Sequence, residues 1–230
     1  MNTFLDILAW MWRIAGYAQP ETVKPEPVSD DQLYNGGNLP TVEVTAVGFR
    51  APYWTKIVHD VLSPDIDPIH IDALYMAWRQ YGDQIDRQFC YILATVWHEC
   101  RFRPGPERRA HKYRQPRLWK LQERYWPSGY YGRGYVQLTW KTNYERFSRI
   151  LGMNLVADPD LVNRPHIGAA ITVIGMTEGY FTGKNMSYYL DNDPPEWVEA
   201  RRVVNGLDKA REIAATAQLI YNTHNQNKLA

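Results

Sequence analysis

The chain has 230 residues, 45% of them hydrophobic, which is enough to bury one good core or one domain with an appendage. Its two cysteines, Cys90 and Cys100, are too few for a disulfide scaffold and favour synthesis in a reducing cytoplasm. The net charge of +1 hides an asymmetry, because residues 1–70 hold four basic and nine acidic residues, whereas residues 101–149 hold thirteen basic and three acidic ones.

The first expected element is an apolar helix within residues 1–18. Asn2, Asp6, Arg13 and Tyr17 share a narrow polar stripe on a helical wheel, and the opposite side is a wide apolar face. Its 15-residue apolar stretch is short for a bilayer span and lacks the basic start of a good signal peptide. We expect this helix to dock onto protein, including a second copy of the chain. The alternatives are a membrane anchor or export signal, and packing on its own domain.

Residues 19–51 are expected to form a proline-rich linker with one short strand. Acidic residues and an Asn-Gly-Gly turn are interleaved with the prolines, which are Pro20, Pro25, Pro27 and Pro40. Residues 41–47 alternate between polar and apolar and predict the strand. From residue 52 to residue 230 the pattern is largely helical, so 52–230 is assigned to one folded domain. Beyond the helix considered next, the signals predict helices over 139–151, 165–180, 193–204 and 208–222.

The first chemical candidate lies on a helix that Asp83 can cap and that ends near Glu99. Its apolar residues recur at helical spacing and predict a single buried face, made of Ile85, Phe89, Ile92, Leu93, Val96 and Trp97. Glu99 falls near the edge of that face in the last turn, where the helix dipole and partial desolvation disfavour a negative charge and predict a raised proton affinity. A general acid requires this property, but an exposed glutamate that ends a helix fits the same spacing. Cys90 and Cys100 lie about 15 Å apart along this helix and cannot bridge.

The segment from Tyr130 to Trp140, YYGRGYVQLTW, combines aromatic rings with two glycines around an arginine. Glycines permit a tight turn and a close approach to a ligand, and flat rings can stack on sugars. With a carboxylic acid nearby, this combination indicates glycan cleavage. By itself it equally fits a glycine-rich strand entry with aromatic residues in the core.

The order of these features resembles glycoside hydrolase family 19, which contains chitinases and phage or bacterial endolysins. The resemblance covers roughly residues 85–222 and rests on His98-Glu99, YYGRGYVQLTWKTNY, Asp158-Pro159-Asp160-Leu161 and Val204-Asn205-Gly206. It implies a lysozyme-like α+β fold, mostly α, with two lobes around a cleft and a small β-hairpin region between the Glu99 helix and the YGRG block. Plant members carry disulfides that this chain lacks, so the match is nearer to the phage and bacterial branch.

The resemblance implies a second catalytic carboxylate and an inverting mechanism, for which the two carboxyl groups should lie about 6.5 to 9.5 Å apart. Glu107 follows Glu99 by eight residues and Phe102 by five, as in phage-like relatives, after a Pro-Gly-Pro turn that could fold the chain back across the cleft. Glu123 stays open as the alternative, because Gln122-Glu123-Arg124 mimics the pattern of plant members.

The resemblance further implies a set of residues that line the cleft and bind substrate, to which the aromatic argument adds Tyr131. The carried-over positions are Gln137, Thr139, Asn143 and Asn205, and the Thr139 hydroxyl is expected to help hold the attacking water. Ordinary structural roles fit some of them as well. Thr139 fits the N-cap of the helix that runs to Leu151, Asn205-Gly206 fits a helix stop, and His98 fits a structural hydrogen-bonding role better than that of a base.

The predicted function is that of a peptidoglycan-degrading glycoside hydrolase with residues 52–230 as its catalytic domain. It would be made in a bacterial cytoplasm and act at the cell wall, as a phage lysis enzyme or as a virion component. A chitinase is the first alternative, and a non-enzymatic glycan-binding or virion structural protein on a lysozyme fold is the second. No His, Cys or Asp cluster has zinc-ligand spacing, so neither a metal nor another cofactor is expected.

The partners follow from charge and from the N-terminal helix. The basic region 101–149 fits a solvated face, a nucleic-acid surface or a surface that attracts an anionic polymer such as a bacterial wall. No nucleic-acid motif accompanies the charge, so nucleic acid is not an expected partner. The helix within residues 1–18 is expected to dock into a protein assembly such as a phage particle, with membrane association as the runner-up.

Overall fold

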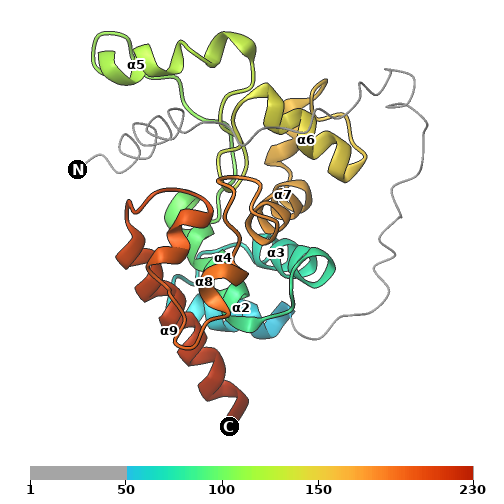
Figure 1. Ribbon diagram of the computed structural model, residues 1–230, viewed down its shortest axis with the longest axis vertical. Helices are drawn as coiled ribbons and strands as arrows, with labels where there is room; N and C mark the ends of the chain where they lie inside the picture. The colour runs from blue at the N-terminus through green and yellow to red at the C-terminus, as the bar shows by residue number, and fades with distance from the viewer. Residues whose placement is uncertain (1–50, 230) are drawn as a thin grey trace.

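The computed structural model describes residues 51–229, so the predictions for residues 1–50 lie outside the described part of the chain. The described part is mostly α-helical, as predicted, and Figure 1 shows the longer helices gathered into one body. The elements are α2 (Ala51–Val61), α3 (Pro68–Tyr81), α4 (Asp86–Cys100), α5 (Pro116–Gln122), η3 (Trp126–Ser128), α6 (Lys141–Leu151), η4 (Pro159–Asn163), α7 (Pro165–Thr177), α8 (Ser187–Leu190), η5 (Glu199–Val203) and α9 (Ala210–Leu229).

Helix α4 is the central helix of this body and contacts α3, α7, α8 and α9. All nine residues from Gln88 to Val96 are buried, whereas the sequence predicted a single buried face. Neighbouring helices cover α4 from several directions, and a helix that is apolar on most sides is stable only in such a position. The N-cap is Ile85, without a side-chain hydrogen bond, so the predicted capping by Asp83 is wrong.

A left-handed turn ends α4 and directs the chain away from the helical body. Arg101 and Phe102 have φ angles of 54° and 56°, which cost non-glycine residues about 1–3 kcal/mol each. Two contacts hold the turn: the Arg101 guanidinium lies 4.1 Å from the centre of the Trp97 ring, and the Phe102 side chain is buried in the main core. The turn thereby fixes the end of the helix on which Glu99 lies.

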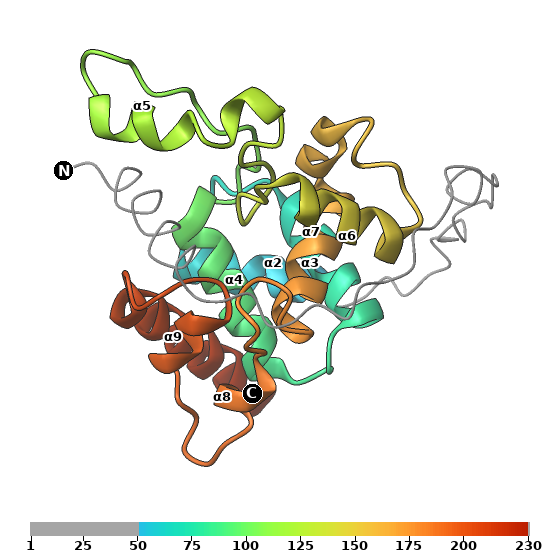
Figure 2. The same cartoon turned by 45° about the horizontal axis from the view of Figure 1, so that its top comes forward.

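Residues 108–128, called the α5 segment below, stand away from the helical body in both views (Figures 1 and 2). Its own apolar contacts are few, since only Ala110 and Leu118 are buried in a small cluster of their own. A separate and larger cluster joins α6, η4 and α7, and its buried members include Leu138, Tyr144, Phe147, Val162 and Ile171. The α5 segment therefore depends on polar and aromatic contacts for its position.

Three further expectations have mixed outcomes. The small β-hairpin is not found as paired strands among residues 51–229; an isolated antiparallel bridge joins Arg133 to Leu138, inside the YGRG block rather than before it. Helices α7 and α9 occupy the predicted ranges 165–180 and 208–222 approximately, but only Glu199–Val203 of the range 193–204 is helical. Both cysteines are free, as predicted.

Within the described residues, no helix has the length and apolarity that crossing a membrane requires.

Candidate active site

Glu99 lies in the last turn of α4, in contact with an arginine that the sequence did not reveal. Its Oε1 atom is 2.6 Å from Nη1 of Arg201, and the two side chains are 4% and 1% exposed. The atoms are close enough for an ion pair but are not aligned for a hydrogen bond. Glu99 is therefore a buried side chain beside the Arg201 guanidinium and not an exposed glutamate at a helix end.

Asn205 lies four residues after Arg201 and is linked to it through the backbone. The Arg201 Nε atom donates to the Asp208 carbonyl at 3.2 Å, and the Arg201 carbonyl accepts the Asn205 backbone N–H at 2.9 Å. The Asn205 side chain turns back on its own backbone, because its Oδ1 atom accepts the Gly206 N–H at 2.8 Å. The sequence feature that could have pointed to Arg201 as a site residue is its position about one helical turn before the Val-Asn-Gly motif.

His98, the neighbour of Glu99, is held in a structural role. Its Nε2 atom is 2.9 Å from the Thr216 hydroxyl of α9. Burial lowers the pKa of His98 to about 4, and the positive charges of Arg101, Lys209 and Arg201 add to this effect. The imidazole is therefore neutral near pH 7 and joins α4 to α9.

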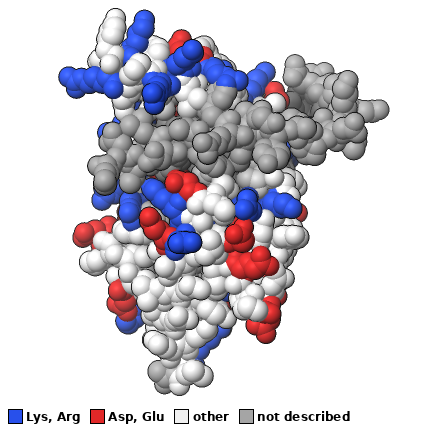
Figure 3. All heavy atoms as spheres, turned by 60° about the vertical axis from the view of Figure 1, so that its left-hand side comes forward, with Lys and Arg blue, Asp and Glu red and all other residues white. Residues whose placement is uncertain are grey.

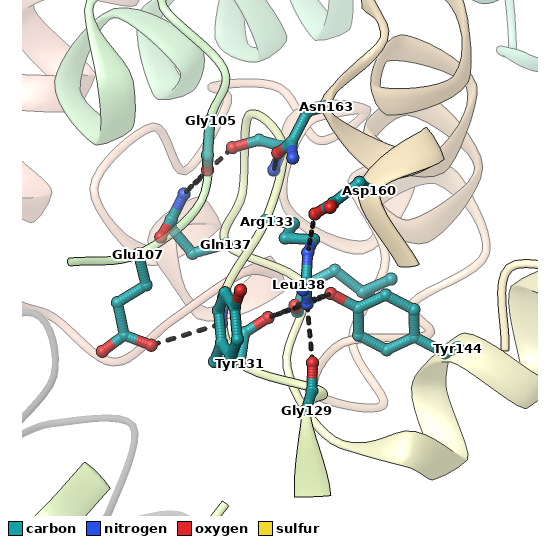
Figure 4. Close-up of polar contacts among 12 residues, drawn as sticks. Gly105, Glu107, Gly129, Tyr131, Arg133, Gln137, Leu138, Tyr144, Asp160 and Asn163 are labelled. Carbon is teal, nitrogen blue, oxygen red and sulfur yellow. Dashed lines mark hydrogen bonds and ion pairs between the residues drawn. The ribbon is translucent and has the colours of Figure 1, made fainter. Parts of the chain in front are cut away.

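Glu107 is buried in a polar network beside the YGRG block. Its Oε1 atom accepts hydrogen bonds from Gln122 Nε2 and from the Tyr125 hydroxyl, both at 2.7 Å. Its Oε2 atom accepts the Gly132 N–H at 3.2 Å, and its own backbone N–H donates to the Gly132 carbonyl at 2.7 Å. Figure 4 shows the carboxylate directed toward this block. Residues 103–110 form no helix, strand or turn, so the predicted turn at Pro-Gly-Pro is not found. The position of Glu107 across the cleft from Glu99 stays a prediction.

The arginine of the YGRG block, Arg133, is the structural centre of the block and is only 4% exposed. Its Nε atom donates to Asp160 at 2.7 Å, and its Nη1 atom donates to the Gly129 carbonyl, the Tyr131 carbonyl and the Tyr144 hydroxyl at 2.9 to 3.2 Å (Figure 4). These contacts tie the block to η4 and α6. The arginine of the motif therefore shapes the backbone around Glu107.

Gln137 extends from the block to the Pro-Gly-Pro segment. Its Nε2 atom donates to the carbonyls of Gly105 and Gly134, each at 3.1 Å. A Cβ atom on Gly132 would lie 2.8 Å from Gln137 Oε1, so a side chain there would have to displace the Gln137 amide. Gln137 Oε1 is buried and has no hydrogen-bond donor within residues 51–229.

Thr139 and Asn143 continue from Gln137. The Thr139 hydroxyl donates to the Gln137 carbonyl at 2.8 Å, and the Asn143 amide donates to the Thr139 carbonyl at 2.8 Å. The prediction that Thr139 caps α6 is wrong. Trp140 is the N-cap residue of α6, and its side chain forms no capping hydrogen bond. Since the Thr139 hydroxyl uses its proton on Gln137, its oxygen can still accept a hydrogen bond from water.

Tyr131 has both faces of its ring covered. The Trp126 ring stacks on one face at 4.3 Å, and the Arg133 guanidinium lies 3.9 Å from the ring centre, which requires the opposite face. On the far side of Trp126, Arg109 lies between Trp126 and Trp119, at 4.8 and 4.0 Å from their ring centres. Tyr131 can therefore offer a sugar its hydroxyl and its ring edge, but not a free ring face.

The alternative carboxylate, Glu123, lies on the surface of the α5 segment. Its side chain is 49% exposed, and it forms an ion pair with Arg109. Glu107 by contrast is 4% exposed and contacts the YGRG block.

The predicted residues thus fall into two groups. Glu99 contacts Arg201, which was not predicted, and Arg201 is linked to Asn205 through the backbone. Glu107 contacts the YGRG block, from which Gln137, Thr139 and Asn143 continue. No hydrogen bond or ion pair within residues 51–229 joins the two groups directly. A cavity of about 370 Å³ lies beside the end of α4, lined among others by Asp67, His70, Trp97 and Arg103. In the same part of the chain, no three His, Cys, Asp or Glu side chains are grouped as a metal site would require.

Three comparisons relate these residues to known proteins. A sequence model of the chitinase class I family, glycoside hydrolase family 19, matches residues 102–178. Two endochitinases of Arabidopsis thaliana are each 51% identical to this chain over 35 residues, which is 15% of this chain and 12% of each relative's length. The structure of a chitinase C mutant aligns with a TM-score of 0.49 and 21% identity, over 74% of this chain and 91% of the other.

Proposed function

We propose that the chain, whose residues 102–178 match the model of glycoside hydrolase family 19, cleaves β-1,4 linkages between amino sugars by acid and base catalysis with inversion. The observation that carries the proposal is that Glu99 and Glu107 are both buried, Glu99 beside the Arg201 guanidinium and Glu107 among three hydrogen-bond donors. Glu107 follows Glu99 by eight residues, and the turn that ends α4 lies between them.

Glu99 is proposed to be the general acid that protonates the glycosidic oxygen. As its proton leaves, a negative charge develops on the carboxyl group, and the Arg201 guanidinium at 2.6 Å compensates that charge. Arg201 needs no reorganisation to do this, because its Nε atom is already fixed on the Asp208 carbonyl.

Glu107 is proposed to be the second carboxylate, which activates water. An ionised carboxylate can accept about four hydrogen bonds, and three donors already contact this one. The remaining acceptor position suits one water molecule. The Thr139 oxygen is a further acceptor in the same group of residues.

The basic α5 segment favours peptidoglycan over chitin as the polymer. Five exposed cations in this segment form no ion pair within residues 51–229: Arg108, Lys112, Arg114, Arg117 and Lys120. Figure 3 shows lysine and arginine side chains gathered at the top of the molecule, where α5 lies in Figure 1. Bacterial walls are anionic and chitin is not, so only a wall would gain from this charge. We further propose a phage-type role, in lysis or in a virion.

A side-by-side assay of purified bacterial walls and colloidal chitin tests the proposal. We expect new reducing ends to appear rapidly from walls and slowly from chitin. The opposite ranking would support a chitinase, the activity that the names of the Arabidopsis relatives carry. Binding to either polymer without any cleavage would support a glycan-binding or virion structural protein.

A further inference from the structure

Two of the three donors to Glu107 come from the α5 segment, 15 and 18 residues later in the chain. These donors, Gln122 and Tyr125, are 0% and 3% exposed. Both contact the same carboxylate oxygen, Oε1, at 2.7 Å. The other oxygen, Oε2, accepts only the longer hydrogen bond from the Gly132 N–H at 3.2 Å.

The Gln122 amide is fixed in one orientation. Its Oε1 atom accepts the Ala110 N–H at 2.6 Å, and its Nε2 atom donates to both Glu107 and the Arg108 carbonyl. A flipped amide would place its NH₂ group against the Ala110 N–H and its oxygen against two acceptors, so it would lose all three hydrogen bonds. Gln122 therefore presents a donor to Glu107 and cannot present an acceptor.

The Tyr125 hydroxyl is also held as a donor. Burial raises the pKa of Tyr125, and the neighbouring Glu107 carboxylate raises it further, so the phenol keeps its proton. The Tyr125 ring is positioned against Trp140 in an edge contact at 5.4 Å. Trp140 has φ 76° and ψ 134°, a backbone conformation that non-glycine residues rarely adopt and that persists only when the surroundings enforce it.

We propose that Gln122 and Tyr125 are positioning residues for Glu107, which saturate Oε1 and leave Oε2 as the oxygen that accepts the attacking water. This inference rests on the proposed function of Glu107. It makes the α5 segment part of the catalytic site, since its docking supplies both donors. The stacking of Arg109 between Trp119 and Trp126 holds the same segment in place.

The test is the pH dependence of kcat and KM on a soluble amino-sugar oligosaccharide for Tyr125→Phe and Gln122→Met. A carboxylate that loses a donor binds its proton more tightly, so the acidic limb of the profile should move to higher pH by about one unit. We expect kcat to fall by about tenfold with little change in KM. Tyr130→Phe is the matched control: it removes a tyrosine hydroxyl that donates to the Val156 carbonyl and does not touch Glu107, so its profile should not move.

Glu107→Gln separates failure of this inference from failure of the proposed function. If Glu107→Gln is inactive while Tyr125→Phe and Gln122→Met keep the unaltered profile, Glu107 acts but the positioning role is wrong. If Glu107→Gln stays active, the role of Glu107 itself is wrong. Should Gln122→Met not fold, Tyr125→Phe alone decides, because it preserves the ring and its contact with Trp140.

Discussion

Single residues in the candidate site were predictable from the sequence only where a local signal marks them. Glu99 stands at the end of an apolar helix, and the family resemblance pointed to Glu107 with Glu123 as the alternative; the catalytic roles of these residues stay predictions. Arg201 lies 102 residues from Glu99 in the chain, and no local pattern announces that pairing. The same holds for Gln122 and Tyr125, whose donors reach Glu107 only after the α5 segment has docked.

His98 should make stability depend on pH in a defined window. Its pKa is lowered to about 4, from an ordinary value near 6.5, so between these values the unfolded chain binds more protons than the folded one. The free energy of unfolding is therefore expected to fall as pH drops from about 6.5 to 4. Urea unfolding of the unaltered protein and of His98→Gln at pH 7 and pH 4.5 measures this. Equal losses in both proteins would contradict the assignment.

Gly134 is expected to be intolerant of a side chain. Its φ is 74°, and a Cβ atom would lie 2.9 Å from both a side-chain and a backbone atom of Val162. Gly134→Ala should lower the free energy of unfolding by about 1–3 kcal/mol, measured by thermal or urea unfolding. Gly105→Ala is the control, since a Cβ there meets nothing within 4 Å. Equal stability of the two variants would exclude this explanation.

At the scale of elements, the sequence predicted where helices form, but it did not predict how many neighbouring helices cover each of them. The apolar spacing located α4, but it predicted one buried face because periodicity does not show how many neighbours a helix will have. The YGRG block was read as a binding element, and its arginine instead holds η4 and α6 to the block through contacts that are distant in the chain. Within residues 51–229 the expected hairpin between α4 and the YGRG block is not found as paired strands, and the isolated bridge Arg133–Leu138 lies inside the block.

The α5 segment should make activity on walls sensitive to salt. Exposed charges are screened beyond about 8 Å at physiological ionic strength, so attraction to an anionic wall weakens as salt rises. Replacing Lys112, Arg114, Arg117 and Lys120 with glutamine should lower wall cleavage at low salt by about tenfold and flatten its salt dependence. Cleavage of a soluble oligosaccharide should not change.

A matched set of exposed arginines outside the α5 segment controls for total charge: Arg79, Arg149, Arg164 and Arg211, each replaced by glutamine. This variant should retain the salt dependence of the unaltered protein. If both quadruple variants behave alike, net charge and not the α5 segment governs attraction to the wall, and the basic surface is only a solvated face.

At the scale of the whole molecule, every residue proposed for the site lies within residues 51–229, and residues 1–50 lie outside the described part. Deleting residues 1–40 is therefore expected to leave a soluble, monomeric and active hydrolase, measured by light scattering and by cleavage of soluble oligosaccharides. Loss of activity or misfolding would show that the segment belongs to the catalytic domain. The proposal that residues 1–18 dock the enzyme onto a phage particle, with a membrane as the runner-up, would then fail.

The family match covers 77 residues, from 102 to 178, so it includes Glu107 and the YGRG block but not Glu99 or Arg201. The central claim, that Glu99 and Glu107 act as a catalytic pair, therefore depends on direct measurement. Loss of a general acid typically costs about 10² to 10⁴ in rate. Glu99→Gln should also be less stable, because it leaves Arg201 buried without its counter-charge, and circular dichroism must first show that the variant is folded.

The most direct test is the rate of bond cleavage, and the anomeric form of the first product by NMR, for the unaltered protein, Glu99→Gln and Glu107→Gln on one soluble amino-sugar oligosaccharide. We expect inverted product from the unaltered protein and a loss of at least about 10² in rate for each folded variant. A folded Glu99→Gln protein that cleaves at the unaltered rate would contradict the account.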